Sequence, residues 1–118
     1  MKFKLAIADQ VTVPVSFRVA DGAKTVSFNF SLIMDRQTDE QWNAGVKGDG
    51  DGATHERIKA HLVAITKDWK NQAFVLDDQG KPADFCAEAL EVMLSSVGVA
   101  DAVLNAYMKE NSAKAKNS

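Results

Sequence analysis

The chain has 118 residues, of which 46% are hydrophobic and 25% charged. This composition is sufficient for one modest core and excludes wholesale disorder. Fourteen basic residues stand against sixteen acidic ones, for a formal charge of -2, which disfavours a dedicated nucleic-acid-binding protein because such proteins need a basic surplus or a basic face. Cys86 is the only cysteine, so no disulfide can form within the chain. No apolar run approaches the roughly 20 residues that span a bilayer, and we expect a single domain in the cytoplasm.

Apolar and polar residues alternate through the first third of the chain, as in half-buried β-strands. Three runs show this pattern, at Phe3–Ile7, Val11–Val19 and Val26–Leu32. A short turn over residues 8–10 would pair the first run with the second. The sequence therefore predicts a small antiparallel sheet within residues 2–33.

Asp21-Gly22 is a hairpin signal between the second and third runs. A two-residue loop there pairs Phe17 with Val26, whereas a four-residue loop pairs Phe17 with Phe28. Both registers keep the apolar side chains on one face, so the pattern leaves both open. Pro14 cannot donate a hydrogen bond to a neighbouring strand, so the strand lies at an edge or bulges there. Of these two, we favour the bulge.

Helical patterns replace the alternation after Leu32. Thr38 and Gln41 have the spacing of a capping box, which opens a short helix that carries Trp42. Residues 45–53 are rich in glycine and aspartate and are typical of a flexible surface loop. Thr54 is a candidate N-cap for a second helix, whose apolar stripe consists of Ile58, Leu62, Ile65 and Trp69.

Two further helices follow a turn at Asp77–Gly80. The first has one apolar face, made by Leu90, Met93, Leu94 and Val97. Gly98 separates it from a last amphipathic helix, whose apolar residues are Val99, Val103, Ala106 and Tyr107. We expect one α+β domain over residues 1–110, with the N-terminal antiparallel sheet packed against three to four short helices at 38–110, and a flexible polar tail at 111–118.

Two fragments resemble metal sites, but their residues do not have the spacing that metal binding requires. A calcium-binding EF-hand loop beginning at Asp49 needs a glycine where Thr54 stands and a glutamate where Ala60 stands. His55 and His61 are six residues apart, about 240° around a helix, so they point to different faces. The sequence therefore predicts no metal site and no cofactor.

No catalytic pattern is present either. Cys86 lies between Asp84 and Glu88, whose charges oppose thiolate formation, and we expect it to be an inert packing residue. There is no phosphate-binding loop, dinucleotide fingerprint or Ser-His-Asp order. The sequence predicts a protein that is not an enzyme.

One ordered series of residues is more specific as a whole than any of its motifs alone. It runs through Trp69, Phe74-Val75-Leu76, Asp77-Asp78-Gln79-Gly80-Lys81-Pro82, Phe85, Glu88-Ala89-Leu90, Tyr107 and Lys114-Ala115-Lys116-Asn117. Together with Val26–Phe30, this order resembles the tail assembly chaperones of long-tailed bacteriophages, which are also encoded by prophages. Cys86 departs from the family's usual capping serine or threonine, so we expect Asp84 to cap that helix instead.

The resemblance implies a non-enzymatic function. Members of the family bind the tape measure protein, a long helical, apolar-rich chain, and keep it soluble until tail tube subunits polymerise around it. The expected partner is therefore the tape measure protein, with the tail tube protein and a second copy of the chain as further candidates. No nucleic acid or membrane is expected, and the protein should be absent from the mature virion. Two alternatives stay open: a minor structural tail or connector protein of the virion, and a bacterial small-ligand or regulatory module.

Partner binding would need apolar residues that the core does not require. A helical ligand is usually bound by an apolar groove, and methionine adapts to varied partners. The candidate partner-binding residues are Trp42, Met93, Tyr107 and Met108. We assign Trp69 to the core, because it continues the apolar stripe of the second helix.

Overall fold

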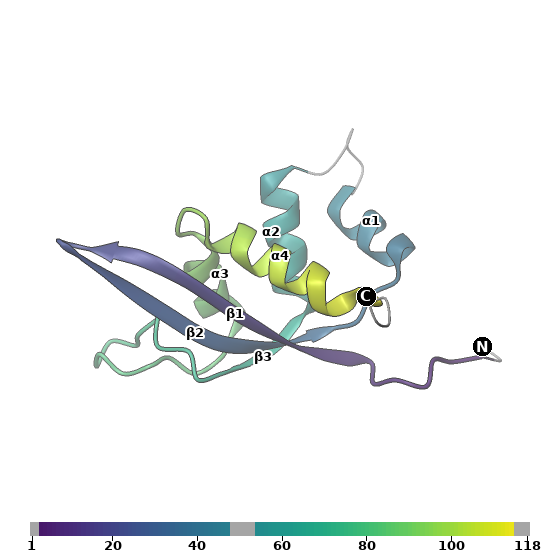
Figure 1. Cartoon of the computed structure of the whole chain (residues 1–118), viewed down its shortest axis with the longest axis horizontal. Helices are drawn as coiled ribbons and strands as arrows, with labels where there is room; N and C mark the ends of the chain where they lie inside the picture. The colour runs from purple at the N-terminus through teal and green to yellow at the C-terminus, as the bar shows by residue number, and fades with distance from the viewer. Residues whose placement is uncertain (1–2, 48–53, 115–118) are drawn as a thin grey trace.

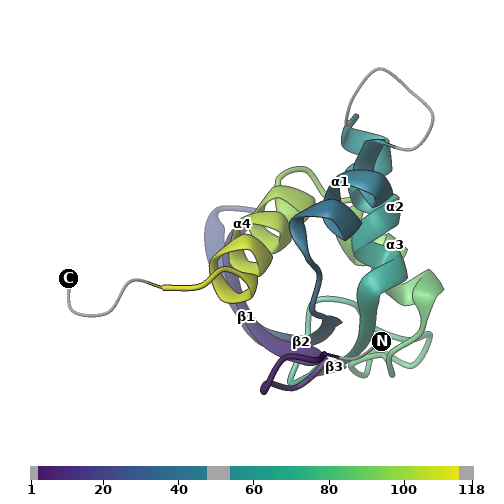
Figure 2. The ribbon, with the colours of Figure 1, turned by 90° about the vertical axis from the view of Figure 1, so that its right-hand side faces the viewer.

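The computed structural model describes residues 3–47 and 54–114. Its elements are β1 (Gln10–Asp21), β2 (Lys24–Asp35), α1 (Asp39–Lys47), α2 (His55–Ile65), β3 (Thr66–Lys70), α3 (Ala87–Leu94) and α4 (Val99–Asn111). The three strands form an antiparallel sheet in the order β1-β2-β3. All four helices lie on one side of this sheet, and α4 packs over β1 (Figures 1 and 2). The predicted α+β class is confirmed.

The core lies between the sheet and the helices. Alternation places Val13, Val15, Leu32 and Met34 on the covered face of the sheet, where they are fully buried. The helices contribute the other large fully buried side chains, which are Leu62, Leu90, Met93, Leu94, Val103 and Tyr107. In the described part of the chain, no helix is long and apolar enough to cross a membrane.

The β1–β2 hairpin adopts the second of the two registers left open by the sequence. Phe17 pairs with Phe28, and the ladder continues to Asp21↔Lys24. Only Gly22 and Ala23 remain in the loop, and Gly22 has a φ of 65°, a conformation that suits glycine in tight hairpins. The loop therefore has two residues, but they are Gly22-Ala23 instead of Asp21-Gly22, and the ladder is one pair longer than a four-residue loop allows.

The predicted bulge at Pro14 is wrong, because the ladder runs unbroken through Pro14↔Ser31. β1 is an edge strand. The Arg36 N–H donates to the Asp9 carbonyl at 2.8 Å, and these two residues continue the register of the ladder. Hydrogen-bonded pairs alternate with non-bonded pairs in antiparallel sheets, so the even-numbered residues of β2 form the hydrogen bonds to β1. Pro14 is paired with the odd-numbered Ser31, and its nitrogen is therefore directed to the open edge. The missing N–H therefore costs no hydrogen bond.

The first predicted strand does not form. Residues 3–9 contain no strand, and Phe3, Leu5 and Ile7 are 81%, 68% and 53% exposed. Because the ladder register places Asp9 opposite Arg36, the chain N-terminal to Asp9 runs beyond the end of β2 instead of folding back on β1. We call residues 3–9 the N-terminal arm.

The predicted helix ending at Trp69 is also wrong in its second half. α2 ends at Ile65, and the backbone of Thr66 is extended, with its hydroxyl donating to the Leu62 carbonyl at 2.6 Å. Trp69 lies on β3, paired with Leu32. It is nevertheless buried, as expected for a core residue, because it is paired with Leu32 on the covered face of the sheet and paired residues lie on the same face.

The predicted helix starts at Thr38 and Thr54 are confirmed. The Thr38 N–H donates to Gln41 Oε1 at 2.9 Å, and the Gln41 N–H donates to Thr38 Oγ1 at 3.1 Å, which completes the capping box. Thr54 Oγ1 accepts from the Arg57 N–H at 3.2 Å. Of the loop predicted at 45–53, residues 45–47 belong to α1, and the remainder lies outside the described residues.

The start of α3 differs from the prediction. Cys86, not Asp84, is the N-cap, and its Sγ accepts from the Ala89 N–H at 3.4 Å. Cys86 is exposed, so it is not a packing residue. Val97 is fully exposed rather than on the core face, because α3 ends at Leu94. Gly98, with a φ of 86°, then starts α4 as expected.

Candidate partner-binding surface

Three of the four predicted partner-binding residues lie together at the junction of α1 and α4. The ring of Trp42 stacks on that of Tyr107, with centroids 5.5 Å apart and planes 27° apart. Trp42 and Met108 line a shallow hollow of about 330 Å³. The other residues that line it are Gln37, Thr38, Asp39, Asn111, Ser112 and Ala113, most of which are polar. Met93 lies on α3, away from this group.

Burial separates the four candidates. Tyr107 and Met93 are fully buried, whereas Trp42 and Met108 are half-buried and pack against the edge of the core. The choice of Tyr107 and Met93 as residues that the core does not need is therefore wrong, because α4 and α3 turn them toward the sheet. Trp42 and Met108 remain candidates for direct contact with a partner.

The hollow has a rigid floor, because α4 is fastened to the segment between β2 and α1. The Tyr107 hydroxyl donates to the Asp35 carbonyl at 2.8 Å. Asn111 donates to the Gln37 carbonyl at 3.0 Å and accepts from the Gln37 N–H at 3.2 Å. Burial, reinforced by the charge of Asp35, raises the pKa of Tyr107 to about 12, so the hydroxyl stays a donor at neutral pH.

His61 supports Trp42 from the side of α2. Its ring meets Trp42 edge-on at 5.1 Å, and its Nε2 lies 2.6 Å from Gln37 Oε1. Neutral His61 with its proton on Nε2 donates to Gln37 Oε1 in this arrangement. Gly45 allows this close packing of α1 on α2, since a Cβ at that position would overlap the His61 ring. Burial lowers the pKa of His61 below its usual value of 6.5.

This lowered pKa predicts a loss of stability in mild acid. The folded protein favours neutral His61, while the unfolded chain binds a proton near pH 6.5, so the contribution is complete above pH 6.5 and is lost as the pH falls through the folded-state pKa. We expect the urea midpoint of the wild type to fall more between pH 8 and pH 5 than that of His61→Gln, whose amide can still donate to Gln37. Equal pH dependence in the two proteins would contradict the assignment.

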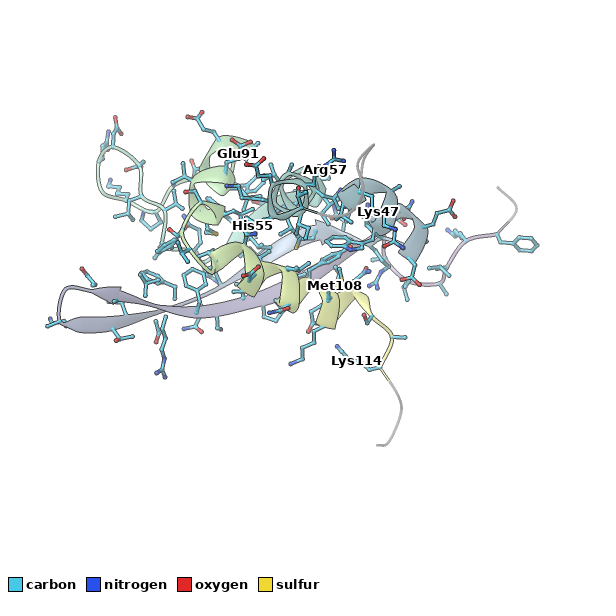
Figure 3. The ribbon with its side chains drawn as sticks, turned by 90° about the horizontal axis from the view of Figure 1, so that it is seen from above. Lys47, His55, Arg57, Glu91, Met108 and Lys114 are labelled. Carbon is cyan, nitrogen blue, oxygen red and sulfur yellow. The ribbon has the colours of Figure 1, made fainter. Side chains whose placement is uncertain are left out.

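Exposed apolar side chains also occur on α3 and in the segments before and after it, and they were not predicted from the sequence. Leu76 and Val92 are 52% and 56% exposed, and Val97 is fully exposed. Residues 71–101 also carry six acidic side chains and one basic side chain. Figure 3 places Glu91 on α3 well apart from Met108 on α4. Val97 is exposed because α3 ends at Leu94, three residues before it, so the helical spacing from Leu90 and Leu94 does not extend to it.

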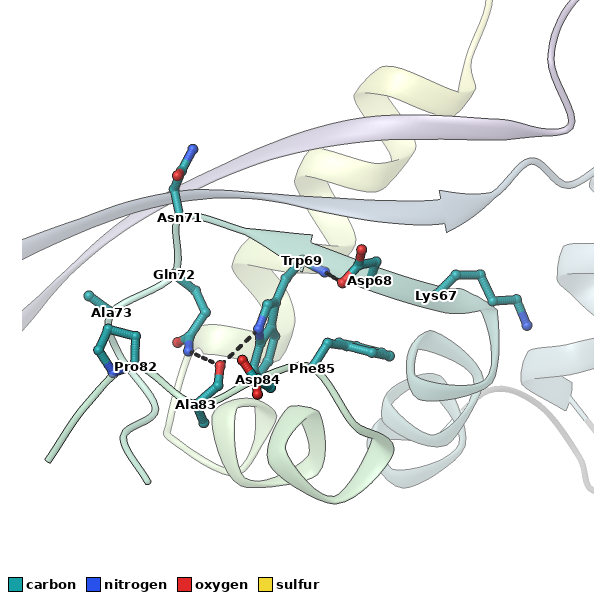
Figure 4. Close-up of a pocket in the computed structure, with 10 residues that line it drawn as sticks. All are labelled: Lys67, Asp68, Trp69, Asn71, Gln72, Ala73, Pro82, Ala83, Asp84 and Phe85. Atoms are coloured by element: carbon teal, nitrogen blue, oxygen red, sulfur yellow. Dashed lines mark hydrogen bonds between the residues drawn. The ribbon is translucent and has the colours of Figure 1, made fainter. Parts of the chain in front are cut away.

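The largest hollow, about 780 Å³, lies beside β3 (Figure 4). The buried Gln72 side chain donates to the carbonyls of Val75 and Ala83 and accepts from the N–H groups of Phe74 and Val75, at 2.9 to 3.1 Å. Trp69 Nε1 also donates to the Ala83 carbonyl, at 3.1 Å. These groups hold residues 71–85 against β3, and none of the buried side-chain polar atoms in the described residues is left without a partner. The polar groups here therefore have a structural role.

Residues 3–47 and 54–114 contain no group of three or more His, Cys, Asp or Glu side chains that could hold a metal ion. His61 is engaged with Gln37 and Trp42, and the structure does not bring His55 to it. The glycine and aspartate positions at 48–52 lie outside the described residues.

The fold and this surface were compared with known proteins. No protein-family model, no curated protein and no solved structure matches the chain. These comparisons therefore assign neither a family nor a function to the chain.

Proposed function

We propose that this protein is a tail assembly chaperone of a long-tailed bacteriophage or prophage, which binds the tape measure protein and keeps it soluble in the host cytoplasm until the tail tube forms. The ordered series of residues around Asp77–Pro82, with Trp69 before it and Tyr107 after it, supports this family. In this function the protein is not an enzyme and is absent from the finished virion.

The observation that carries the proposal is the pairing of Trp42 with Met108 in one hollow. Both side chains are half-buried, so each presents apolar surface without being required in the centre of the core. A hollow that combines Trp42 and Met108 with polar neighbours fits one face of an amphipathic helix, because the helix can place an apolar side chain on these two residues and its flanking polar groups beside the polar ones. Methionine can adjust its rotamers to successive, non-identical helices of a long partner.

The test is co-expression with the tape measure protein encoded in the same genome. We expect the wild type to raise the soluble fraction of the tape measure protein and to co-purify with it. Met108→Lys should reduce the co-purified amount at least tenfold, because it places a charge in the apolar hollow. The matched control is Val92→Lys, an equally apolar-to-charged change on the separate surface of α3.

Each result has a definite meaning. If the wild type does not increase the soluble tape measure protein, the proposed function is wrong. If Val92→Lys abolishes binding and Met108→Lys does not, the function stands and the binding surface is α3. Detection of the chain by mass spectrometry in purified, mature particles would instead favour a structural tail protein.

A further inference from the structure

The N-terminal arm has the pattern of a strand but no strand partner. Phe3, Leu5 and Ile7 share one parity and are all exposed, with Lys4 and Ala6 on the other parity. The arm leaves the domain at the end of the molecule opposite to the hairpin loop (Figure 1). Alternating apolar side chains on an extended segment are stable in water only when a second strand or a surface covers them.

The same chain also has an unpaired strand edge. β3 pairs only with residues Ser31 to Met34 of β2. At Asn71, with a φ of 63°, the chain turns away from the sheet. Residues 25–29 of β2 therefore have no paired strand on the side where β3 would otherwise continue.

The free backbone groups at this edge can be identified. Even-numbered residues of β2 bond to β1, so Thr25, Ser27 and Asn29 direct their N–H and carbonyl groups to the open side. All three are exposed, and none has a backbone hydrogen-bond partner on that side among the described residues. An edge of this kind is a template for pairing with another strand.

The other two edges of the sheet are each interrupted at one position. β1 presents Pro14, which has no N–H to donate. On β3, the outward N–H of Trp69 is already bonded to Asp68 Oδ1 at 2.8 Å. The stretch at 25–29 has no such interruption.

An apolar surface adjoins this open edge. Phe28 and Phe17 face the helices, and Phe74 packs on them with ring centroids 4.9 Å and 5.1 Å away, respectively. All three rings are half-buried. Neighbouring strands place paired residues on the same face, so a strand added here would direct alternate side chains onto these rings. The arm supplies three such side chains within five residues, matching the five residues of the edge.

The arm of a molecule cannot reach its own open edge. The long axis of the structure is 52 Å, and the arm and the hairpin loop lie toward its two ends. The seven residues of the arm span at most about 25 Å when fully extended. We propose that residues 3–7 of the N-terminal arm of one copy add as a strand to residues 25–29 of β2 in a second copy. Main-chain hydrogen bonds stabilise this contact, and the three apolar side chains of the arm select the edge next to Phe28 and Phe74.

Sedimentation velocity over a range of protein concentrations tests the contact. We expect the wild type to self-associate and the double variant Leu5→Lys/Ile7→Lys, whose side chains are exposed in the single copy, to associate at least tenfold more weakly. Asn29→Pro removes an outward N–H from the open edge and should weaken association equally. Ser16→Pro is the matched control, because it is paired with Asn29, loses the same 2.6 Å hydrogen bond between their side chains, and alters only the outer edge of β1.

Mixing the two defective proteins gives the decisive result. The arm variant retains an intact edge and Asn29→Pro retains an intact arm, so together they should form a one-to-one complex that neither forms alone. Amide hydrogen exchange at Ser27 should also slow with concentration in the wild type but not in the arm variant, a readout that needs no change in β2. The proposal would be overturned if the wild type stays monomeric over a 100-fold range of protein concentration, or if the arm variant associates as strongly as the wild type. The contact uses neither Trp42 nor Met108, so its failure leaves the proposed function intact.

Discussion

Tyr107→Ala is expected to destabilise the protein by about 3–5 kcal/mol, the range for removing a large buried aromatic ring. Tyr107 is fully buried and is the largest such side chain in the described residues. It packs α4 on the sheet, supports the ring of Trp42 and donates to the Asp35 carbonyl. Its removal leaves a cavity beneath the hollow and an unbonded carbonyl at the end of β2. Urea unfolding followed by far-UV circular dichroism measures the change.

Tyr107→Phe separates the ring from the hydroxyl. This variant keeps the packing and loses only the hydrogen bond to Asp35, so we expect a cost of about 1–2 kcal/mol. Because the Tyr107 side chain is not at the surface, we expect any loss of tape measure binding in Tyr107→Ala to be proportional to the decrease in the folded fraction of the protein. An alanine variant as stable as the phenylalanine variant would contradict the described packing of α4.

Gln72→Leu is expected to cost about 3 kcal/mol or more, although leucine has a similar size. The N–H groups of Phe74 and Val75 both donate to the Gln72 amide, whereas the carbonyls of Val75 and Ala83 keep a second donor in the Ala83 N–H and in Trp69 Nε1. Leucine therefore leaves two N–H groups unbonded, and each buried group left unbonded costs about 1–3 kcal/mol. Because these bonds hold the segment between β3 and α3, the loss should appear first as faster amide hydrogen exchange at Phe74 and Val75, followed by a lower urea midpoint.

Gln79→Leu is the matched control for this prediction. Gln79 lies in the exposed turn at 77–80, and no hydrogen bond of its side chain is found among the described residues. The same substitution there should change stability by less than about 0.5 kcal/mol. Equal effects of the two substitutions would show that the Gln72 hydrogen bonds are not a main stabiliser of this segment.

Two of the four candidate binding residues, Trp42 and Met108, could be predicted from the sequence. Trp42 was recognisable because the capping box fixes where α1 begins, and Met108 because it follows Tyr107 on a clear amphipathic helix. Whether each side chain would be buried or half-exposed depends on how closely α1, α2 and α4 approach one another. Gly45 beside His61 sets one of these approaches, and nothing local in the sequence states which side chain it meets.

The features that sequence determined by itself are those fixed within a few residues along the chain: the hairpin and its apolar face, the caps at Thr38 and Thr54, and the break at Gly98. They arise from hydrogen bonds between near neighbours and from the side-chain period of each element. Tertiary structure decided that Thr66–Lys70 is a strand, that residues 3–9 are not, and that Pro14 lies at an edge. A strand requires a partner edge from a distant part of the chain, and an apolar residue is buried only when another element covers it, so neither property is contained in local periodicity.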